Sequence, residues 1–273
     1  MNAPRATMPR FGLGTWRMGE NAATRAEEIA ALTLGLDLGV GLIDTAEMYG
    51  NGGAEEIVGR AIEGRRDDVY LVTKVLPGNA SYAGTLAACE RSLQRLRTDR
   101  IDLYLLHWPG HHPLEETLRA FVELRRRDQI VDYGVSNFDI DEMRHAVALP
   151  GGDGIASNQI LYNLQRRGPE RKLLPWCNAE GISIMAYSPL DQGRLVVKPA
   201  LREVAVRRGV TPYQVAIAWT LVHEGVVSIP KAGKREHVRD NVAAASLLLD
   251  EDDLAALDRA YPAPARDVPL ETA

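Results

Sequence analysis

Eight short apolar runs, the helical stretches between them and the polar residue that ends each run predict a (β/α)8 barrel. The runs are apolar almost throughout, which is typical of parallel strands buried on both faces. Helices that alternate with such strands cover the sheet, and eight units can close it into a barrel. A chain of 273 residues suits one domain of this kind. We therefore expect residues 1–273 to form a single α/β domain of the TIM-barrel type.

The expected strands are spread along almost the whole chain. Each run has the length of a strand and is bounded by turn or helix signals. They are Arg10–Thr15, Gly41–Asp44, Val69–Lys74, Ile101–His107, Ile130–Ser136, Ile155–Gln159, Ile182–Ser188 and Val226–Lys231.

The expected helices carry apolar residues at helical spacing. The segment Thr211–Gln214 combines an N-cap threonine, a proline at the first helical position and a capping-box glutamine. Glycine follows four helical runs, at positions 39, 181, 209 and 225. The expected helices are Ala23–Leu38, Ala54–Ile62, Thr85–Leu96, Leu114–Arg127, Asp139–Leu149, Glu170–Glu180, Pro212–Glu224 and Glu236–Leu247.

An open, doubly wound sheet is the competing fold. Its dinucleotide-binding glycine motif fails here, because Gly12-Leu13-Gly14 is followed by Thr15-Trp16-Arg17 and the third glycine is absent. At the two ends of the barrel we expect a short N-terminal segment that covers the bottom, and an extended tail over Pro262–Ala273 that can lie across the barrel.

Composition excludes several classes of protein. Hydrophobic residues at 45% and charged residues at 25% are ordinary for a globular domain. The formal net charge of −5 and the dispersed arginine clusters give no basic surface for nucleic acid. No run is long and apolar enough to span a membrane, and the N-terminus lacks a signal core. Cys89 and Cys177 form no CxxC pair, so a reduced, cytoplasmic protein is expected, as a monomer.

The polar ends of the expected strands predict a single catalytic cavity. The carboxyl ends of barrel strands meet at one mouth, although they are far apart in the sequence. Asp44, Lys74 and His107 end three consecutive strands, and Tyr49 follows Asp44 on the next loop. Polar strand ends at a surface are common, but a lysine after Tyr-Leu-Val-Thr and a histidine after Tyr-Leu-Leu are not explained in that way.

These four residues can form a proton donor. A tyrosine has a pKa near 10, too high for easy proton exchange at neutral pH. An ammonium about 4 Å away favours the phenolate by up to ~4 kcal/mol at an effective dielectric near 20. We therefore expect Lys74 to lower the pKa of Tyr49, Asp44 to keep Lys74 charged, and His107 to bind a substrate oxygen.

Such a donor suits protonation of a carbonyl oxygen while a hydride reaches the carbon, which indicates a nicotinamide cofactor. Ser136, Asn137 and Gln159 have donors and acceptors for a carboxamide. Tyr187 offers a flat face for a ring, and Lys231 a charge for phosphate.

The chain resembles the aldo-keto reductases, from about Met8 to Tyr261. The motifs that carry the resemblance are Met8–Trp16, Leu42–Ala46 with Tyr49-Gly50, Val72-Thr73-Lys74, Leu103–Pro109, Gly134–Phe138, Asn158-Gln159, Ala186–Leu190 and Ile229-Pro230-Lys231.

The resemblance implies NADPH-dependent reduction of small aldehydes and ketones to alcohols. It makes Asp44, Tyr49, Lys74 and His107 the catalytic tetrad, with Tyr49 as the acid. It places Trp16, Tyr49, His107 and Trp108 beside the substrate carbonyl. The cofactor contacts that it implies are Thr15, Trp16, Asp44, Ser136, Asn137, Gln159, Tyr187, Ser188, Leu190, Lys231, His237 and Asn241.

The resemblance is strongest to bacterial members that reduce methylglyoxal and diketogluconate, through Thr45–Tyr49 and Leu174–Cys177. Two departures lie in the cofactor-phosphate segment, where the family often has serine and arginine and this chain has Ala232 and His237. A hydroxyl and a permanent cation are lost. Lys231 still favours a 2′-phosphate, so we expect NADPH to be preferred and NADH to be weaker.

Two other functions compete with this interpretation. His107, His111 and His112 suggest a metal, but matching carboxylate ligands are missing at the strand ends, so no metal is expected. Relatives of the barrel also serve as nucleotide-binding regulatory subunits with little turnover. The intact tetrad favours an enzyme.

Overall fold

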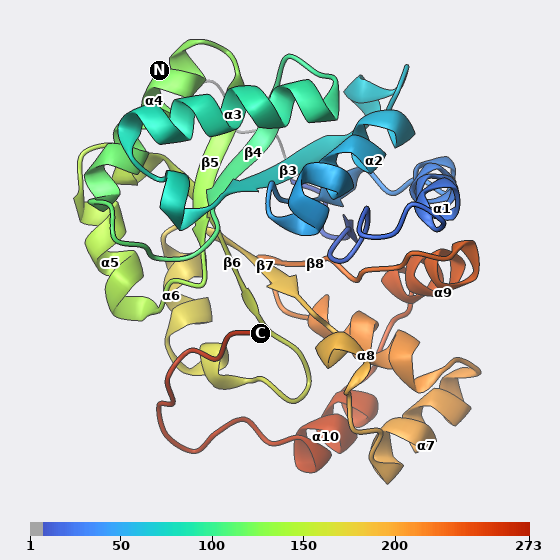
Figure 1. Cartoon of the computed structure of the whole chain (residues 1–273). Helices are drawn as coiled ribbons and strands as arrows, with labels where there is room; N and C mark the ends of the chain where they lie inside the picture. The colour runs from blue at the N-terminus through green and yellow to red at the C-terminus, as the bar shows by residue number, and fades with distance from the viewer. Residues whose placement is uncertain (1–7) are drawn as a thin grey trace.

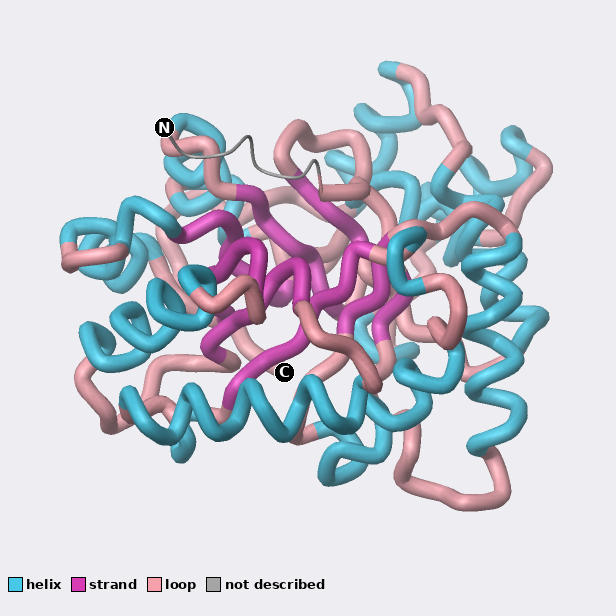
Figure 2. The backbone as a smooth tube through the Cα atoms, turned by 90° about the horizontal axis from the view of Figure 1, so that it is seen from above, coloured by secondary structure: helices cyan, strands magenta, loops and turns pink. Residues whose placement is uncertain are grey.

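Eight parallel strands occupy the centre of the molecule, with helices around them (Figure 1). Seen from above, the strands curl around a common axis (Figure 2). The computed structural model describes residues 8–273. The strands are hydrogen-bonded in chain order: β1 (Leu13–Gly14), β2 (Leu42–Asp44), β3 (Tyr70–Val75), β4 (Ile101–Leu106), β5 (Ile130–Ser136), β6 (Ile155–Leu161), β7 (Ser183–Tyr187) and β8 (Val226–Ser228).

Isolated bridges between the first and last strand regions close the sheet. Phe11 pairs with Ser228 and Gly14 with Lys231, both in parallel. The Gly12 N–H donates to the Ser228 carbonyl at 2.9 Å. The predicted (β/α)8 barrel is therefore confirmed. β1 and β8 are shorter than the apolar runs that predicted them, because single bridges replace a continuous ladder at this seam.

The helices follow the predicted stretches in order, with two additions. α7 and α10 lie outside the predicted ranges. The connection from β7 to β8 holds two helices, α7 and α8, and the chain after β8 also forms two, α9 and α10. The α-helices are α1 (Arg25–Asp37), α2 (Gly53–Ala61), α3 (Tyr82–Leu96), α4 (Leu114–Arg126), α5 (Ile140–Ala148), α6 (Leu173–Ala179), α7 (Pro199–Arg208), α8 (Pro212–Thr220), α9 (Arg235–Ala245) and α10 (Glu251–Ala260).

The helix ends show the predicted local chemistry. The Thr211 hydroxyl accepts a hydrogen bond from the Gln214 N–H at 3.2 Å, and the Gln214 side chain accepts one from the Thr211 N–H at 2.9 Å. This is the predicted capping box at the start of α8. Glycines 39, 181 and 209 have positive φ and directly follow the ends of α1, α6 and α7. Gly225 also has positive φ, but α8 ends earlier than predicted, at Thr220, so this glycine lies in the turn before β8.

The core has two layers. Leu42, Val72, Leu105 and Met185 belong to an apolar cluster that fills part of the barrel. A larger cluster lies between the strands and the helices. Successive strand residues point to opposite faces, so each strand contributes to both layers. Cys89 and Cys177 are buried free thiols, on α3 and α6 as expected.

The two ends of the chain differ in what the structure shows. Of the short N-terminal segment that is predicted to cover the barrel bottom, residues 1–7 lie outside the described residues, and Met8 packs against the apolar cluster inside the barrel. Residues 262–273 form neither helix nor strand, and they run back to the barrel mouth (Figure 1). Arg166 pairs with Glu271 of this tail at 2.5 Å, and the Ala273 N–H donates to the Tyr187 hydroxyl at 3.2 Å. Within residues 8–273, no helix has the length and apolar character needed to cross a membrane.

α2 and α3 approach each other closely at a glycine. A Cβ at Gly59 would lie 2.7 Å from the Arg95 carbonyl oxygen and 2.8 Å from the Leu96 carbonyl carbon. Gly78, in contrast, is exposed, and no heavy atom of the described chain lies within 4 Å of its Cβ position.

We predict that Gly59→Ala destabilises the protein by about 1–3 kcal/mol through overpacking. Helix propensity alone would favour alanine by up to about 1 kcal/mol. Urea unfolding measures the change in the free energy of unfolding, with Gly78→Ala as the near-neutral control. A Gly59→Ala protein as stable as the wild type would contradict the close packing of α2 on α3.

Candidate active site

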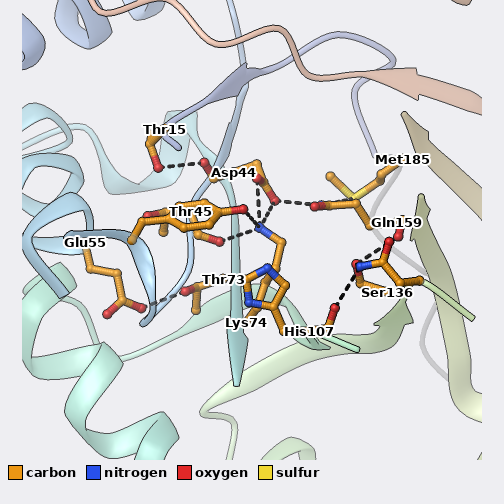
Figure 3. Close-up of polar contacts among 12 residues, drawn as sticks. Thr15, Asp44, Thr45, Glu55, Thr73, Lys74, His107, Ser136, Gln159 and Met185 are labelled. Carbon is orange, nitrogen blue, oxygen red and sulfur yellow. Dashed lines mark hydrogen bonds and ion pairs between the residues drawn. The ribbon is translucent and has the colours of Figure 1, made fainter. Parts of the chain in front are cut away.

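The ammonium of Lys74 lies at the centre of the predicted tetrad (Figure 3). Lys74 is on β3 and is fully buried. Its Nζ lies 2.8 and 2.9 Å from the two carboxylate oxygens of Asp44, at the end of β2. It also donates to the Thr45 carbonyl at 2.7 Å and to the Tyr49 hydroxyl at 3.3 Å. The structure thus brings together the acid, the cation and the phenol that the sequence predicted.

Strand geometry explains this arrangement. β2 and β3 are neighbouring parallel strands, and Asp44 is in register with Val72. Successive residues of β3 point to opposite faces, so the Lys74 side chain enters the barrel while that of Thr73 points toward the helices. The Asp44 carbonyl is held by the N–H and the hydroxyl of Thr15, each at 3.0 Å.

His107 completes the tetrad at the end of β4. Its ring centroid lies 5.7 Å from that of Tyr49 and 4.8 Å from that of Trp108. Burial, and then the nearby charge of Lys74, lower the pKa of His107 to about 2. His107 is therefore neutral at physiological pH. Its Nδ1 is enclosed, and residues 8–273 offer this atom no hydrogen-bond partner.

The protonation of Tyr49 differs from the prediction. Burial, and then the charge of Asp44, raise the pKa of the phenol well above its ordinary value. Burial lowers the pKa of Lys74, and the charge and hydrogen bond of Asp44 oppose that effect. Lys74 was expected to lower the phenol pKa, but the loss of water around a buried phenol outweighs it. Tyr49 therefore holds its proton at neutral pH.

The predicted carboxamide contacts line the cavity, and their side chains are also hydrogen-bonded to other groups of the protein. The Gln159 amide donates to Asp44 Oδ1 at 2.8 Å, and Ser136 donates to the Gln159 carbonyl at 2.8 Å. Asn137, with a φ of 62°, donates to the His107 carbonyl at 3.1 Å and accepts from the Tyr187 hydroxyl at 2.9 Å. Asp44 therefore has a second donor, besides Lys74, that the sequence did not reveal.

A cavity of about 660 Å³ opens over these residues. Lys74 lies behind its wall, and Thr15 is fully buried and holds the strand end, so neither lines it. The other predicted site residues all line the cavity: Trp16, Asp44, Tyr49, His107, Trp108, Ser136, Asn137, Gln159, Tyr187, Ser188, Leu190, Lys231, His237 and Asn241.

One side of the cavity lies around α9. Lys231, His237 and Asn241 line this side, together with the acid Asp240. The N-cap residue of α9 is Lys234, and its side chain makes no capping hydrogen bond. Its ammonium group adds positive charge near a helix N-terminus, where the helix dipole is also positive. Burial lowers the pKa of Lys231, and Glu28 opposes that shift. Helix N-termini with nearby cations bind anionic groups such as phosphate.

Several cavity residues were not predicted from the sequence. Met48, Gln192, Tyr213 and Ala273 also line the cavity. Asn163, fully buried, supports the loop after β7, where its amide donates to the Ser188 carbonyl at 2.9 Å. The only signal for Asn163 in the sequence is its place just after the apolar run of β6. An asparagine buried at such a strand end needs hydrogen-bond partners, which indicates weakly that it holds a nearby loop.

The remaining histidines of the metal hypothesis do not join the site. His111 and His112 are exposed. Within residues 8–273, no group of three or more His, Cys, Asp or Glu side chains is arranged to hold a metal ion.

Comparison with known proteins places this site in a family. Residues 10–262 match the model of the aldo/keto reductase family. Methylglyoxal reductase YeaE of Escherichia coli K12 is 49% identical over 94% of this chain and 93% of its own. Glyoxal reductase of Bacillus subtilis is 34% identical over 92% and 88%.

A solved structure agrees with this match. The aldo/keto reductase from Klebsiella pneumoniae, in complex with NADP and acetate, superposes with a TM-score of 0.95. It is 48% identical and covers 97% of this chain and 95% of its own. The chain therefore belongs to the aldo/keto reductase family.

Proposed function

We propose that this protein reduces small aldehydes and ketones with NADPH, and that α-keto aldehydes such as methylglyoxal are among its substrates. The observation that carries the proposal is the Tyr49 hydroxyl, 3.3 Å from the buried Lys74 ammonium, on the wall of a large cavity. As an aldo/keto reductase, the protein is an NAD(P)H-dependent oxidoreductase.

The cavity suits a nicotinamide dinucleotide. It is large, it has a tyrosine ring near the tetrad, and it has Lys231, His237 and the N-terminus of α9 for phosphate. The loop after β7, held by Asn163, brings Ser188 and Leu190 to the same wall. When bound, NADPH supplies the hydride for the carbonyl carbon. The NADP-bound Klebsiella relative supports this choice of cofactor.

The chain's own residues handle the proton. The raised pKa keeps Tyr49 protonated, so its hydroxyl can donate to the carbonyl oxygen as negative charge develops there. The Lys74 ammonium stabilises the phenolate that remains, and Asp44 keeps that ammonium charged. Neutral His107 can donate from Nε2 to the same oxygen, because enclosed Nδ1 is better left as an unpaired acceptor than as an unpaired N–H.

The entrance of the cavity agrees with small substrates. Trp16, Met48 and Trp108 contribute apolar surface to the cavity wall. Two relatives are named methylglyoxal reductase and glyoxal reductase, and both names refer to small dicarbonyl substrates. We also propose that the protein acts in the cytoplasm as a monomer, where its two free thiols stay reduced.

We predict that Tyr49→Phe lowers kcat for methylglyoxal reduction at least about a hundredfold, because the proton donor is lost. The dissociation constant for NADPH, from quenching of protein fluorescence, should stay close to that of the wild type. Tyr82→Phe, on α3 and outside the cavity, is the matched control. NADPH absorbance with a panel of carbonyls gives the rates.

Three outcomes separate the alternatives. A wild-type protein that binds NADPH but reduces no carbonyl would favour the regulatory subunit. A Tyr49→Phe protein with normal turnover would exclude Tyr49 as the donor. Reduction of other carbonyls without any turnover of methylglyoxal and related dicarbonyls would remove the proposed substrate class alone.

We predict that kcat/KM with NADPH exceeds kcat/KM with NADH by about tenfold or more, since charge-assisted bonds to a phosphate contribute about 1.5–3 kcal/mol. Lys231→Met should reduce the preference, and His237→Arg, which restores a permanent cation, should increase it. Arg144→Met, on α5, exposed and outside the cavity, is the control. Equal values for the two cofactors in the wild type would contradict the proposed phosphate site.

A further inference from the structure

A second buried carboxylate lies behind the tetrad, outside the cavity. Glu55, on the first turn of α2, is fully buried. It accepts a hydrogen bond from the Thr73 hydroxyl at 2.6 Å and one from Arg95 Nε at 2.6 Å (Figure 3 shows the bond to Thr73). A buried carboxylate is costly unless it is paired and hydrogen-bonded, and this one is both.

The partners of Glu55 come from the elements that position the proton donor. Thr73 directly precedes Lys74 on β3. Arg95, from α3, packs closely against the last residue of the turn Tyr49–Gly52: a Cβ at Gly52, which has a φ of 88°, would lie 2.6 Å from Arg95 Cδ. The Glu55–Arg95 ion pair therefore contacts both elements: Glu55 is hydrogen-bonded to the strand that carries Lys74, and Arg95 packs against the turn that carries Tyr49.

A neighbouring ion pair, between α1 and α2, is exposed and serves for comparison. Glu56 pairs with Arg25 of α1 at 2.6 Å, with side chains 49% and 35% exposed. Exposed pairs of this kind contribute little to stability. In the Glu55–Arg95 pair the carboxylate is fully buried and the arginine side chain is 23% exposed. Because desolvation of a buried charge offsets much of the attraction within such a pair, stability alone is a weak reason for it at this place.

We propose that Glu55, together with Arg95 and Thr73, is a positioning residue for proton transfer: it fixes Tyr49 relative to Lys74 and adds negative charge behind the Lys74 ammonium. The inference rests on the proposed function. Glu55 also raises the pKa of Lys74, after the larger contributions of Asp44, and so opposes the effect of burial.

The test compares Glu55→Gln with Glu56→Gln, its neighbour on the same helix. We expect Glu55→Gln to lower kcat for carbonyl reduction about tenfold to a hundredfold, as displaced catalytic groups do. The dissociation constant for NADPH should change less than about twofold, because the cavity residues remain. Glu56→Gln should match the wild type in both measurements.

The pKa of the Lys74 ammonium gives a readout that needs no turnover. Titration of ¹⁵N-lysine-labelled protein by NMR, with Lys74→Met for assignment, should show a lower pKa of Lys74 in Glu55→Gln than in the wild type, because a negative charge near the ammonium is removed. The upper limb of the kcat–pH profile should move in the same direction.

Two further variants keep the test decisive if Glu55→Gln does not fold. Arg95→Lys retains a cation and should keep most of kcat, whereas Arg95→Met should lose it. Thr73→Val removes only the hydroxyl and should lower kcat without unfolding the protein. Each variant is checked by thermal unfolding.

A lower melting temperature with wild-type kcat and wild-type Lys74 pKa would overturn the proposal, because the pair would then serve only to hold the helices. Equal effects of Glu55→Gln and Glu56→Gln would overturn it as well. A wild-type protein without carbonyl turnover would contradict the proposed function, while the Lys74 titration would still decide the role of Glu55.

Discussion

The buried ammonium of Lys74 imposes the strongest physical requirement on this structure. A fully buried ion loses its hydration at an effective cost of several kcal/mol, so it needs close partners in fixed positions. Asp44 and the Thr45 carbonyl meet this need, and both follow from the end of β2. β2 lies parallel to β3 in a register that places Asp44 opposite Val72. This pairing presents the Asp44 carboxylate to Lys74 on the adjacent strand.

The surrounding barrel stabilises this pair on several sides. Gln159 approaches Asp44 from β6, far away in the sequence, and can do so only because the sheet closes. Asn137 and Ser188 adopt left-handed backbone conformations at the ends of β5 and β7. Such conformations persist where the surrounding structure holds them, and they often mark functional sites. Here they place side chains and loops around one cavity.

The strand order, and the meeting of Asp44, Tyr49, Lys74 and His107 at one end of the barrel, can be predicted from the sequence because both depend on local patterns. Apolar runs and their polar ends are visible along the chain, and barrel closure brings the ends together. Hydrogen-bond partners are less predictable: nothing near Gln159 indicates that its amide reaches Asp44. The pKa of Tyr49 was expected to fall, but it depends on how completely the phenol is buried. α7 and α10 are additions to the pattern of one helix after each strand, so that pattern does not predict them. The position of Ala273 at the cavity mouth depends on contacts of the C-terminal tail, such as the ion pair of Arg166 with Glu271.

The chemistry of the site depends on an Asp44 carboxylate that keeps Lys74 charged beside a protonated Tyr49. ¹⁵N NMR of the Lys74 side chain at pH 7, in the wild type and in Asp44→Asn, measures this charge. We predict a protonated ammonium in the wild type and a neutral amine in Asp44→Asn, because burial alone lowers the pKa of a lysine. A neutral Lys74 in the wild type, or the same protonation state in both proteins, would contradict the account.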